Sequence, residues 1–145
     1  MKENPEKDDS RLADPGLPIY AAGKPESQEV HMLVTKEFTF NGAHRLLGYH
    51  GKCEQLHGHS WKVHVTVQAP VGEDGLAFDF IRLKKIVEDK AISQLDHTYL
   101  NDLIPNPSAE HIALWIWDRM KGEIPLFEVK VFETATSFVT YRGEG

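Results

Sequence analysis

Apolar and polar side chains alternate along two stretches of the chain, and this pattern predicts two strands. From residue 34 to residue 40 the apolar side chains fall on even positions, with Phe38 and Phe40 among them. In the second stretch, residues 57–67, every odd position from Trp61 onward is apolar. A period of two is typical of a strand with one buried face.

Helical spacing of apolar residues follows in two later segments. Asp79 can cap a helix that runs to about Gln94, and Ser108 can cap a second helix. Gly122 and Pro125 follow the second apolar pattern and are expected to end that helix. The segment between the two helices is expected to be a loop.

Two further strands are predicted at residues 127–132 and 137–142. The element order β-β-α-α-β-β favours an α+β fold, with a four-stranded antiparallel sheet and both helices on one face. Such a sheet leaves its edges and one face uncovered. Association into an oligomer would cover them.

The N-terminal segment differs from the rest of the chain. Residues 1–31 contain four prolines and many charges, and neither a helical nor a strand period is visible. We expect a flexible extension, or an adapter to a partner chain, in residues 1–31, and one domain in residues 32–145.

Composition narrows the class of protein. The 145 residues are 41% hydrophobic and 26% charged, which is typical of a globular domain. The net charge of −6 disfavours a nucleic-acid surface. No apolar run approaches the ~20 residues of a membrane span, and no secretory signal is evident, so we expect a cytoplasmic protein. The single cysteine excludes an intrachain disulfide.

Three of the eight histidines are expected to share one face of the sheet. His57 and His59 are two residues apart and continue the apolar face of their strand, and His44 has the parity of Phe40 on the neighbouring strand. Three neutral imidazoles suit Zn²⁺ and leave a fourth position for water or substrate. The alternative is an accidental histidine pair near a strand end.

Cys53 and Glu54 lie four and three residues before His57, in a polar segment. The neighbouring cation Lys52 can lower the pKa of a thiol toward a reactive thiolate, and Glu54 is a second candidate base. A lone cysteine is otherwise a small buried hydrophobe, and Glu54 is otherwise a solvated loop charge.

Two more polar groups are candidates for chemistry. In Asp96-His97, a carboxylate can orient an imidazole and form a proton relay, although such a pair can also simply cap a loop. Glu133 ends a strand with an apolar inward face, and its carboxylate could hold a ring edge that presents two parallel N–H donors. The alternative for Glu133 is an exposed strand-end charge.

Taken together, these residues resemble the 6-pyruvoyl-tetrahydropterin synthase and 6-carboxytetrahydropterin synthase family over about residues 33–144. The resemblance rests on four motifs in order: Phe40-Asn41-Gly42-Ala43-His44-Arg45-Leu46, Cys53-Glu54-Gln55-Leu56-His57-Gly58-His59-Ser60, Leu95-Asp96-His97-Thr98-Tyr99-Leu100-Asn101 and Glu133-Thr134-Ala135-Thr136. The family has the tunnelling fold, in which β-β-α-α-β-β subunits form oligomeric barrels. The usual assembly is a hexamer of two trimers, with active sites between subunits.

The resemblance implies a role for each candidate residue and a pterin triphosphate, 7,8-dihydroneopterin triphosphate, as the substrate. Arg45 and Lys52 are candidates for the triphosphate only by their place in the sequence. The implied roles are zinc binding by His44, His57 and His59, proton abstraction by Cys53, a proton relay through Asp96 and His97, and pterin binding by Glu133 with Thr134.

The spacing around the cysteine separates the subfamilies. Three residues between Cys53 and His57 resemble the 6-carboxytetrahydropterin synthases of queuosine and 7-deazapurine biosynthesis, which release acetaldehyde and triphosphate. Glu54 also opens a Glu-x-x-His-Gly-His pattern that resembles enzymes cleaving the side chain to 6-hydroxymethyl-dihydropterin, a folate precursor.

We therefore expect a zinc-dependent pterin lyase, with 6-carboxytetrahydropterin synthesis favoured. Side-chain cleavage, alone or as a second activity, is the alternative reaction. A non-catalytic pterin-binding module is the alternative of another class. Without the resemblance, a zinc hydrolase with three histidine ligands would also be viable.

Overall fold

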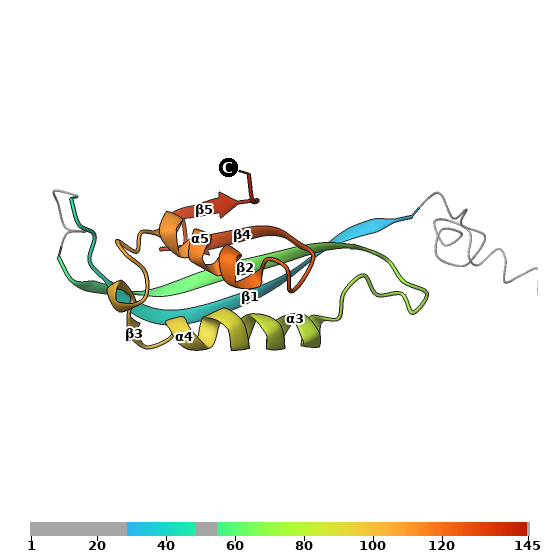
Figure 1. Ribbon diagram of the computed structural model, residues 1–145, viewed down its shortest axis with the longest axis horizontal. Helices are drawn as coiled ribbons and strands as arrows, with labels where there is room; N and C mark the ends of the chain where they lie inside the picture. Colours follow the sequence, from blue (N-terminus) through green and yellow to red (C-terminus); the bar gives the residue numbers. More distant parts are fainter. Residues whose placement is uncertain (1–28, 49–54, 145) are drawn as a thin grey trace, which may run out of the picture.

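The computed structural model describes residues 29–48 and 55–144 as one layer of sheet with helices on one side (Figure 1). Among the described helices, none is long and apolar enough to cross a membrane. The elements, in chain order, are β1 (His31–His44), β2 (His57–Pro70), α3 (Phe80–Val87), the π-helical turn η2 (Glu88–Ile92), α4 (Ser93–Leu95), β3 (Thr98–Tyr99), the 3-10 turn η3 (Leu100–Asp102), α5 (Ala109–Met120), β4 (Leu126–Phe132) and β5 (Phe138–Tyr141).

Both predicted helix caps are confirmed. The Asp79 side chain accepts a hydrogen bond from the Ile81 backbone N–H at the start of α3, and Ser108 accepts one from His111 at the start of α5. The first helix continues from α3 through η2 and α4 to Leu95, one residue beyond the predicted end. Each cap satisfies a backbone donor that the helix itself leaves unpaired.

The sheet has five strands in the order β3-β1-β2-β4-β5, so the prediction of four strands was wrong by one. The additional strand, β3, pairs in parallel with β1 through Gly42 and Ala43, whereas the other pairs are antiparallel. Two residues are too short for a period of two to show, and the sequence therefore predicts only a loop in this segment.

The strands β1 and β2 form the long central pair, and their register extends from His31 opposite Pro70 to His44 opposite His57. β1 therefore begins at His31, the last residue of the predicted N-terminal extension. Pairing along all of β2 gives these early residues hydrogen-bond partners that local propensity does not reveal.

One face of the sheet carries the core. Even positions of β1 and odd positions of β2 point toward the helices, as the alternation predicts. Phe40, Trp61 and Val63 are buried there against Leu83 of α3 and Ile116 of α5. Within the described residues, no helix covers the opposite face, where His64 Nε2 lies 3.0 Å from Glu37 Oε1.

Candidate metal centre and active site

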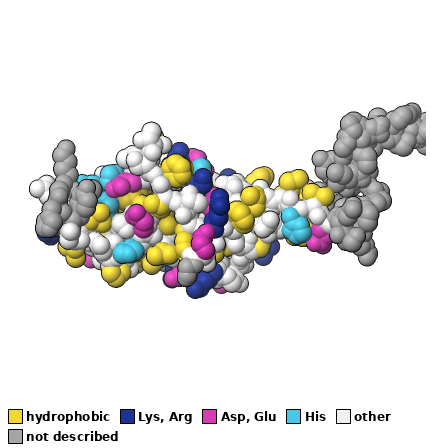
Figure 2. All heavy atoms as spheres, turned by 90° about the horizontal axis from the view of Figure 1, so that it is seen from above, with side chains coloured by type: hydrophobic (Ala, Val, Ile, Leu, Met, Phe, Trp, Pro, Cys, Tyr) yellow, Lys and Arg dark blue, Asp and Glu magenta, His cyan; other side chains and the backbone are white. Residues whose placement is uncertain are grey.

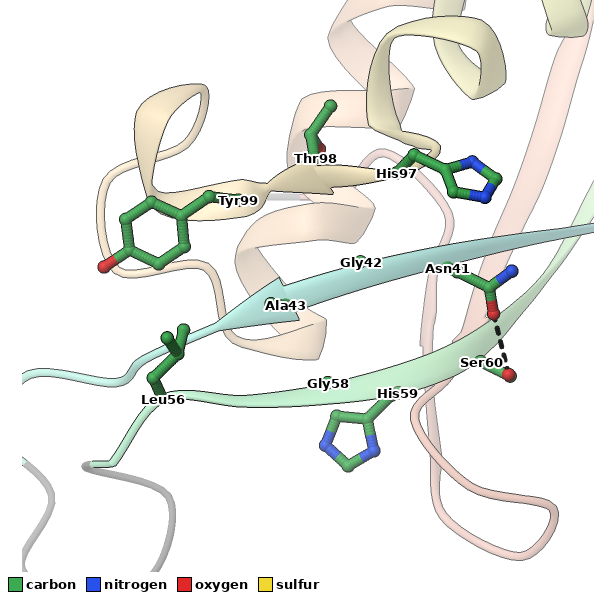
Figure 3. Close-up of a pocket in the computed structure, with 10 residues that line it drawn as sticks. All are labelled: Asn41, Gly42, Ala43, Leu56, Gly58, His59, Ser60, His97, Thr98 and Tyr99. Carbon is green, nitrogen blue, oxygen red and sulfur yellow. Dashed lines mark hydrogen bonds between the residues drawn. The ribbon is translucent and has the colours of Figure 1, made fainter.

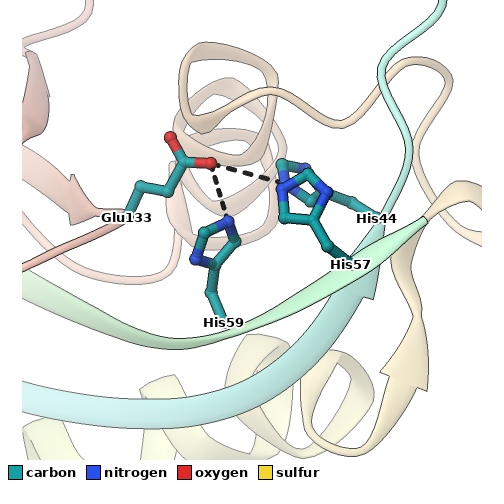
Figure 4. A group of neighbouring side chains, drawn as sticks. All are labelled: His44, His57, His59 and Glu133. Atoms are coloured by element: carbon teal, nitrogen blue, oxygen red, sulfur yellow. Dashed lines mark hydrogen bonds and ion pairs between the residues drawn. The ribbon is translucent and has the colours of Figure 1, made fainter. Parts of the chain in front are cut away.

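Three imidazoles converge where the core face of the sheet ends. His44 closes β1 and lies opposite His57, the first residue of β2, while His59 lies opposite Gly42. The ring centroids are 4.6 Å apart for His44 and His57, 4.7 Å for His57 and His59, and 5.2 Å for His44 and His59 (Figure 4). The predicted convergence of these side chains is therefore confirmed.

Glu133 joins this cluster from the end of β4. Phe132, opposite Lys62, points to the uncovered face, so the next residue points to the core face. The Oε2 atom of Glu133 lies 3.0 Å from His59 Nε2 and 3.4 Å from His44 Nε2 (Figure 4). The carboxylate expected on a pterin ring thus lies among the imidazoles in this structure.

The hydrogen bonds behind two of the rings fix which nitrogens face inward. His44 Nδ1 lies 2.8 Å from the Pro107 carbonyl oxygen, and His57 Nδ1 lies 2.8 Å from the Gln55 carbonyl oxygen. Because a carbonyl oxygen only accepts, Nδ1–H is the donor in each neutral ring. The two Nε2 atoms, 3.1 Å apart, then direct lone pairs at each other, and a cation between them would relieve this contact.

The third ring also has an unsatisfied nitrogen. His59 Nε2 is buried and makes no aligned hydrogen bond, although it lies 3.0 Å from the carboxylate. Burial lowers the pKa of His59 below its usual value, and the negative charge of Glu133 opposes that shift only in part. A neutral imidazole with a free lone pair is the form that binds a metal.

The donor set fits a zinc ion. One ligand atom from each of the three histidines and Glu133 can be chosen so that all lie within 4.8 Å of one another. Zinc is bound by histidine nitrogen and carboxylate oxygen at about 2.0–2.2 Å, usually with four ligands. Hydrogen bonds from the far side of a metal-binding imidazole to a carbonyl oxygen are the usual support of such sites.

Trp61 forms the floor beneath the cluster. Its ring is fully buried, and its centroid lies 5.1 Å from that of His44 and 5.2 Å from that of His59. The indole Nε1–H donates to the Gly42 carbonyl oxygen at 3.1 Å, so the large side chain is satisfied and fixed. The imidazoles therefore stand on a rigid surface rather than on a loop.

Asp96 and His97 form the expected pair, on a different part of the sheet. His97 Nδ1 lies 3.1 Å from Asp96 Oδ2. The Asn41 backbone binds both residues. Its N–H donates to Asp96 Oδ1 at 2.9 Å, and its carbonyl oxygen accepts from the His97 N–H at 2.6 Å. His97 adopts a left-handed backbone with φ of 59°, which these contacts impose.

The electrostatics of this pair suit a relay. The hydrogen bond from the Asn41 backbone N–H, followed by the nearby His97 ring, lowers the pKa of Asp96. An ionised Asp96 can hold the tautomer of His97 and stabilise its protonated form. The His97 side chain is 76% exposed, so its outer nitrogen is accessible to a reacting group.

An open groove of about 600 Å³ lies beside the pair (Figure 3). The Ser60 hydroxyl donates to Asn41 Oδ1 at 2.8 Å within it. In Figure 3 the rings of His97 and His59 point in different directions. The groove is lined by Asn41, Gly42, Ala43, Leu56, Gly58, His59, Ser60, His97, Thr98 and Tyr99.

The remaining predicted residues fall into two groups. Lys52, Cys53 and Glu54 lie outside the described residues. Thr134 lies in the turn after β4, where its Oγ1 accepts hydrogen bonds from the Thr136 and Ser137 backbone N–H groups.

The comparison with protein families gives the decisive observation. The family described as "6-pyruvoyl tetrahydropterin synthase" matches residues 33–144, which include the histidines and Glu133. The chain belongs to the 6-pyruvoyl tetrahydropterin synthase family. It is therefore an enzyme of a pterin-processing family, and the family resemblance inferred from the four motifs is confirmed.

Relatives in the family carry several activities in their names. A 6-pyruvoyl tetrahydrobiopterin synthase of Dictyostelium discoideum is 31% identical over 131 residues, covering 78% of this chain and 97% of its own length. A 6-carboxy-5,6,7,8-tetrahydropterin synthase of Synechocystis is 38% identical over 118 residues, covering 75% and 92%. A dihydroneopterin monophosphate aldolase of Pyrococcus furiosus is 42% identical over 72 residues, covering 50% and 61%.

Solved structures confirm the fold. The Caenorhabditis elegans 6-pyruvoyl tetrahydropterin synthase aligns with a TM-score of 0.74 at 22% identity, over 81% of this chain and 99% of its own. The α+β fold with one sheet and helices on one face is thus that of this family, with β3 as a short fifth strand.

Sequence reasoning missed the groups that orient the site. The carbonyl oxygens of Pro107 and Gln55 and the backbone of Asn41 contribute main-chain atoms, for which residue type gives no signal. The place of Glu133 among the imidazoles did have a signal, because it continues the alternation of Val129 and Val131 on the buried side of β4.

Proposed function

We propose that this chain is a zinc-dependent 6-carboxytetrahydropterin synthase. It would convert 7,8-dihydroneopterin triphosphate and one water molecule to 6-carboxytetrahydropterin, acetaldehyde and triphosphate, as a step of queuosine and 7-deazapurine biosynthesis. The observation that carries the proposal is the convergence of three imidazoles with inward lone pairs in a chain of this family. The Synechocystis relative and the three-residue spacer between Cys53 and His57 support the choice of product.

The metal would be held by His44, His57 and His59 through their Nε2 atoms. A bound zinc ion would polarise the hydroxyl groups of the substrate side chain and make the adjacent C–H and O–H groups more acidic. The carbonyl partners of His44 and His57 keep both rings in the tautomer that this requires.

Protons would move through groups of the chain itself. The Cys53 thiolate would abstract a proton from the substrate side chain, and its place four residues before His57 supports this role. Asp96 and His97 would form the second relay, with Asp96 ionised and the outer nitrogen of His97 exposed to exchange the proton.

The pterin ring would be held near the end of β4. The Glu133 carboxylate can accept two parallel N–H groups from the edge of the ring, which would give both affinity and orientation. Thr134 would assist mainly by fixing the turn, since its hydroxyl oxygen already accepts two backbone N–H groups.

The working unit would be a homo-oligomer, a hexamer of two trimers, with active sites between subunits. Two features support this assembly. The sheet has a face that no described helix covers. The ring of His97 is also 76% exposed and points in a different direction from the ring of His59, which leaves it accessible to the histidines of another subunit.

Side-chain cleavage to 6-hydroxymethyl-dihydropterin is the second candidate reaction. Glu54 in the Glu-x-x-His-Gly-His pattern favours it, together with the aldolase relative of Pyrococcus furiosus. Because Cys53 and Glu54 are both present, one protein could carry both reactions.

Product analysis tests the proposal. The zinc-loaded protein is incubated with 7,8-dihydroneopterin triphosphate, and the products are identified by mass spectrometry. We expect 6-carboxytetrahydropterin and acetaldehyde, and a Cys53→Ala variant should lose this product. A 6-hydroxymethyl product alone, lost in Glu54→Ala, would move the assignment to side-chain cleavage.

Two controls sharpen this experiment. Glu123→Ala removes an exposed carboxylate in the turn between α5 and β4, and should leave both products unchanged. Wild-type turnover by Cys53→Ala would exclude the thiolate as the base. Bound zinc without any turnover would favour the pterin-binding module.

A further inference from the structure

The position of Glu133 goes beyond a role in holding the pterin ring. Its Oε2 atom faces the inward nitrogens of His44 and His59, at 3.4 and 3.0 Å, and Oε1 points away from them (Figure 4). Among the described residues, Glu133 is the carboxylate that completes a four-donor cluster. The chain therefore offers a closed ligand set rather than three histidines with an open position.

The turn that follows β4 holds Glu133 in this place. The Glu133 backbone N–H donates to the Ser137 carbonyl oxygen at 3.0 Å. Thr134 Oγ1 accepts from the N–H groups of Thr136 and Ser137 at 3.3 and 3.1 Å. These hydrogen bonds fix the backbone, so only the Glu133 side-chain torsions need change to move the carboxylate.

Charge favours the same arrangement. Three neutral imidazoles would leave both positive charges of a divalent ion uncompensated in a site where His44 is fully buried. A carboxylate ligand removes one of these charges, and electrostatic attraction is stronger where water is excluded. The Glu133 side chain is 28% exposed, so it can also leave the cluster toward solvent without crossing the core.

We propose that Glu133 is the fourth metal ligand of the substrate-free protein, bound through Oε2. Structural zinc sites are closed by four protein ligands, whereas catalytic sites keep a position open. The site of this chain would be closed at rest and would open when Glu133 exchanges the metal for the pterin ring. The inference rests on the proposed three-histidine zinc site but not on the reaction that follows.

Metal affinity provides the first test. Zinc is titrated into metal-free wild type and into Glu133→Gln in competition with a chromophoric chelator. We expect the variant to bind zinc about 10- to 100-fold more weakly, the range found when even an outer partner of a metal ligand is removed. Equal affinities of the two proteins would overturn the proposal.

The matched control is Glu37→Gln. Glu37 also contacts a histidine at 3.0 Å, His64, but on the opposite face of the same two strands. Loss of this contact should leave zinc affinity at the wild-type value. An equal loss of affinity in both variants would show that removing any glutamate of the sheet weakens the site, and would contradict the specific role of Glu133.

Cobalt substitution gives a second readout that does not depend on a measured affinity. Co²⁺ in the wild-type protein should show the strong visible absorption of a four-coordinate ion, without a thiolate-to-cobalt charge-transfer band. Glu133→Gln should change that spectrum. A thiolate band in the wild type would assign the fourth position to Cys53 and would overturn the proposal.

The two proposals fail in different ways. If Glu133→Gln binds zinc as tightly as the wild type, and the wild type turns over the pterin, Glu133 is rejected as a resting ligand and the proposed function stands. If Glu133→Gln binds zinc more weakly than the wild type, but the wild type does not turn over the pterin, the proposed function is rejected and Glu133 stands as a ligand. Unchanged zinc binding in His57→Ala would reject the three-histidine site itself.

Discussion

The histidine cluster and the Asp96–His97 pair differ in how the chain holds them. His44 is fully buried, stands on Trp61 and has its outer nitrogen bonded to a main-chain carbonyl. His97 is 76% exposed on a left-handed backbone at the rim of an open groove. One imidazole is locked in orientation, and the other is left accessible.

This difference matches the chemistry proposed for each region. A metal ligand must present one lone pair in a fixed direction, which core packing and a carbonyl partner provide. A proton relay must exchange protons with a substrate, so it needs access and an anchor rather than burial. In this fold the anchor is the Asn41 backbone, which holds Asp96 and His97 without covering the His97 ring.

Removal of one buried imidazole should have the largest effect. We expect His57→Ala to lose stoichiometric zinc and to lower kcat/KM for the pterin triphosphate roughly 1,000-fold or more, because the metal supplies several kcal/mol of stabilisation to the transition state. Metal analysis by mass spectrometry and product assays would measure this. Full activity at low zinc content would contradict the role of the cluster.

Removal of the exposed imidazole should separate catalysis from metal binding. His97→Ala should lower kcat by about 100- to 10,000-fold, the usual contribution of a general acid or base. Its zinc content and circular dichroism should stay at wild-type values, because the side chain lies largely outside the core. His31→Ala, at another exposed histidine, is the control and should change none of these quantities.

Metal removal should destabilise the histidine cluster more than the Asp96–His97 pair. With free zinc at 100 times its dissociation constant, binding stabilises the fold by about 2.7 kcal/mol. We expect chelation to lower the unfolding temperature, with hydrogen exchange rising at His44, His57 and His59 more than at Asp96 and His97. Uniform exchange changes over both regions would argue against a local metal centre.

The smallest expected effect is the contribution of the Asp96 charge to the free energy of unfolding. Its pKa is lowered in the folded protein, so the unfolded state binds the proton more tightly and the charge stabilises the fold at neutral pH. In metal-free protein, wild type should be more stable than Asp96→Asn at pH 7, and this difference should vanish as the pH falls below about 4. Urea unfolding across this range would measure it, with Asp118→Asn as an exposed control. A difference that grew on acidification would contradict the sign.

The sequence predicted the histidine cluster because side chains two residues apart on a strand point to the same face of the sheet. His57 and His59 share the parity of Trp61, so their convergence with His44 needed only the pairing of two strands. The caps Asp79 and Ser108 were equally readable, since their side chains act locally.

The rest depends on contacts that are distant in the sequence. β3 exists because Thr98 and Tyr99 meet the edge of β1, and no property of these two residues signals a strand. The hydrogen bonds that hold Asp96 and His97 come from the backbone of Asn41, which lies 55 residues before Asp96 in the chain. The orientation of His44 depends on a carbonyl 63 residues away. Main-chain groups occur in every residue, so tertiary structure alone selects them.

Zinc X-ray absorption spectroscopy of the metal-loaded wild-type protein would measure the ligands of the proposed metal centre. We expect three imidazole nitrogens and one oxygen at about 2.0–2.2 Å in a four-coordinate environment. A sulfur neighbour at about 2.3 Å, or fewer than three imidazoles, would contradict it.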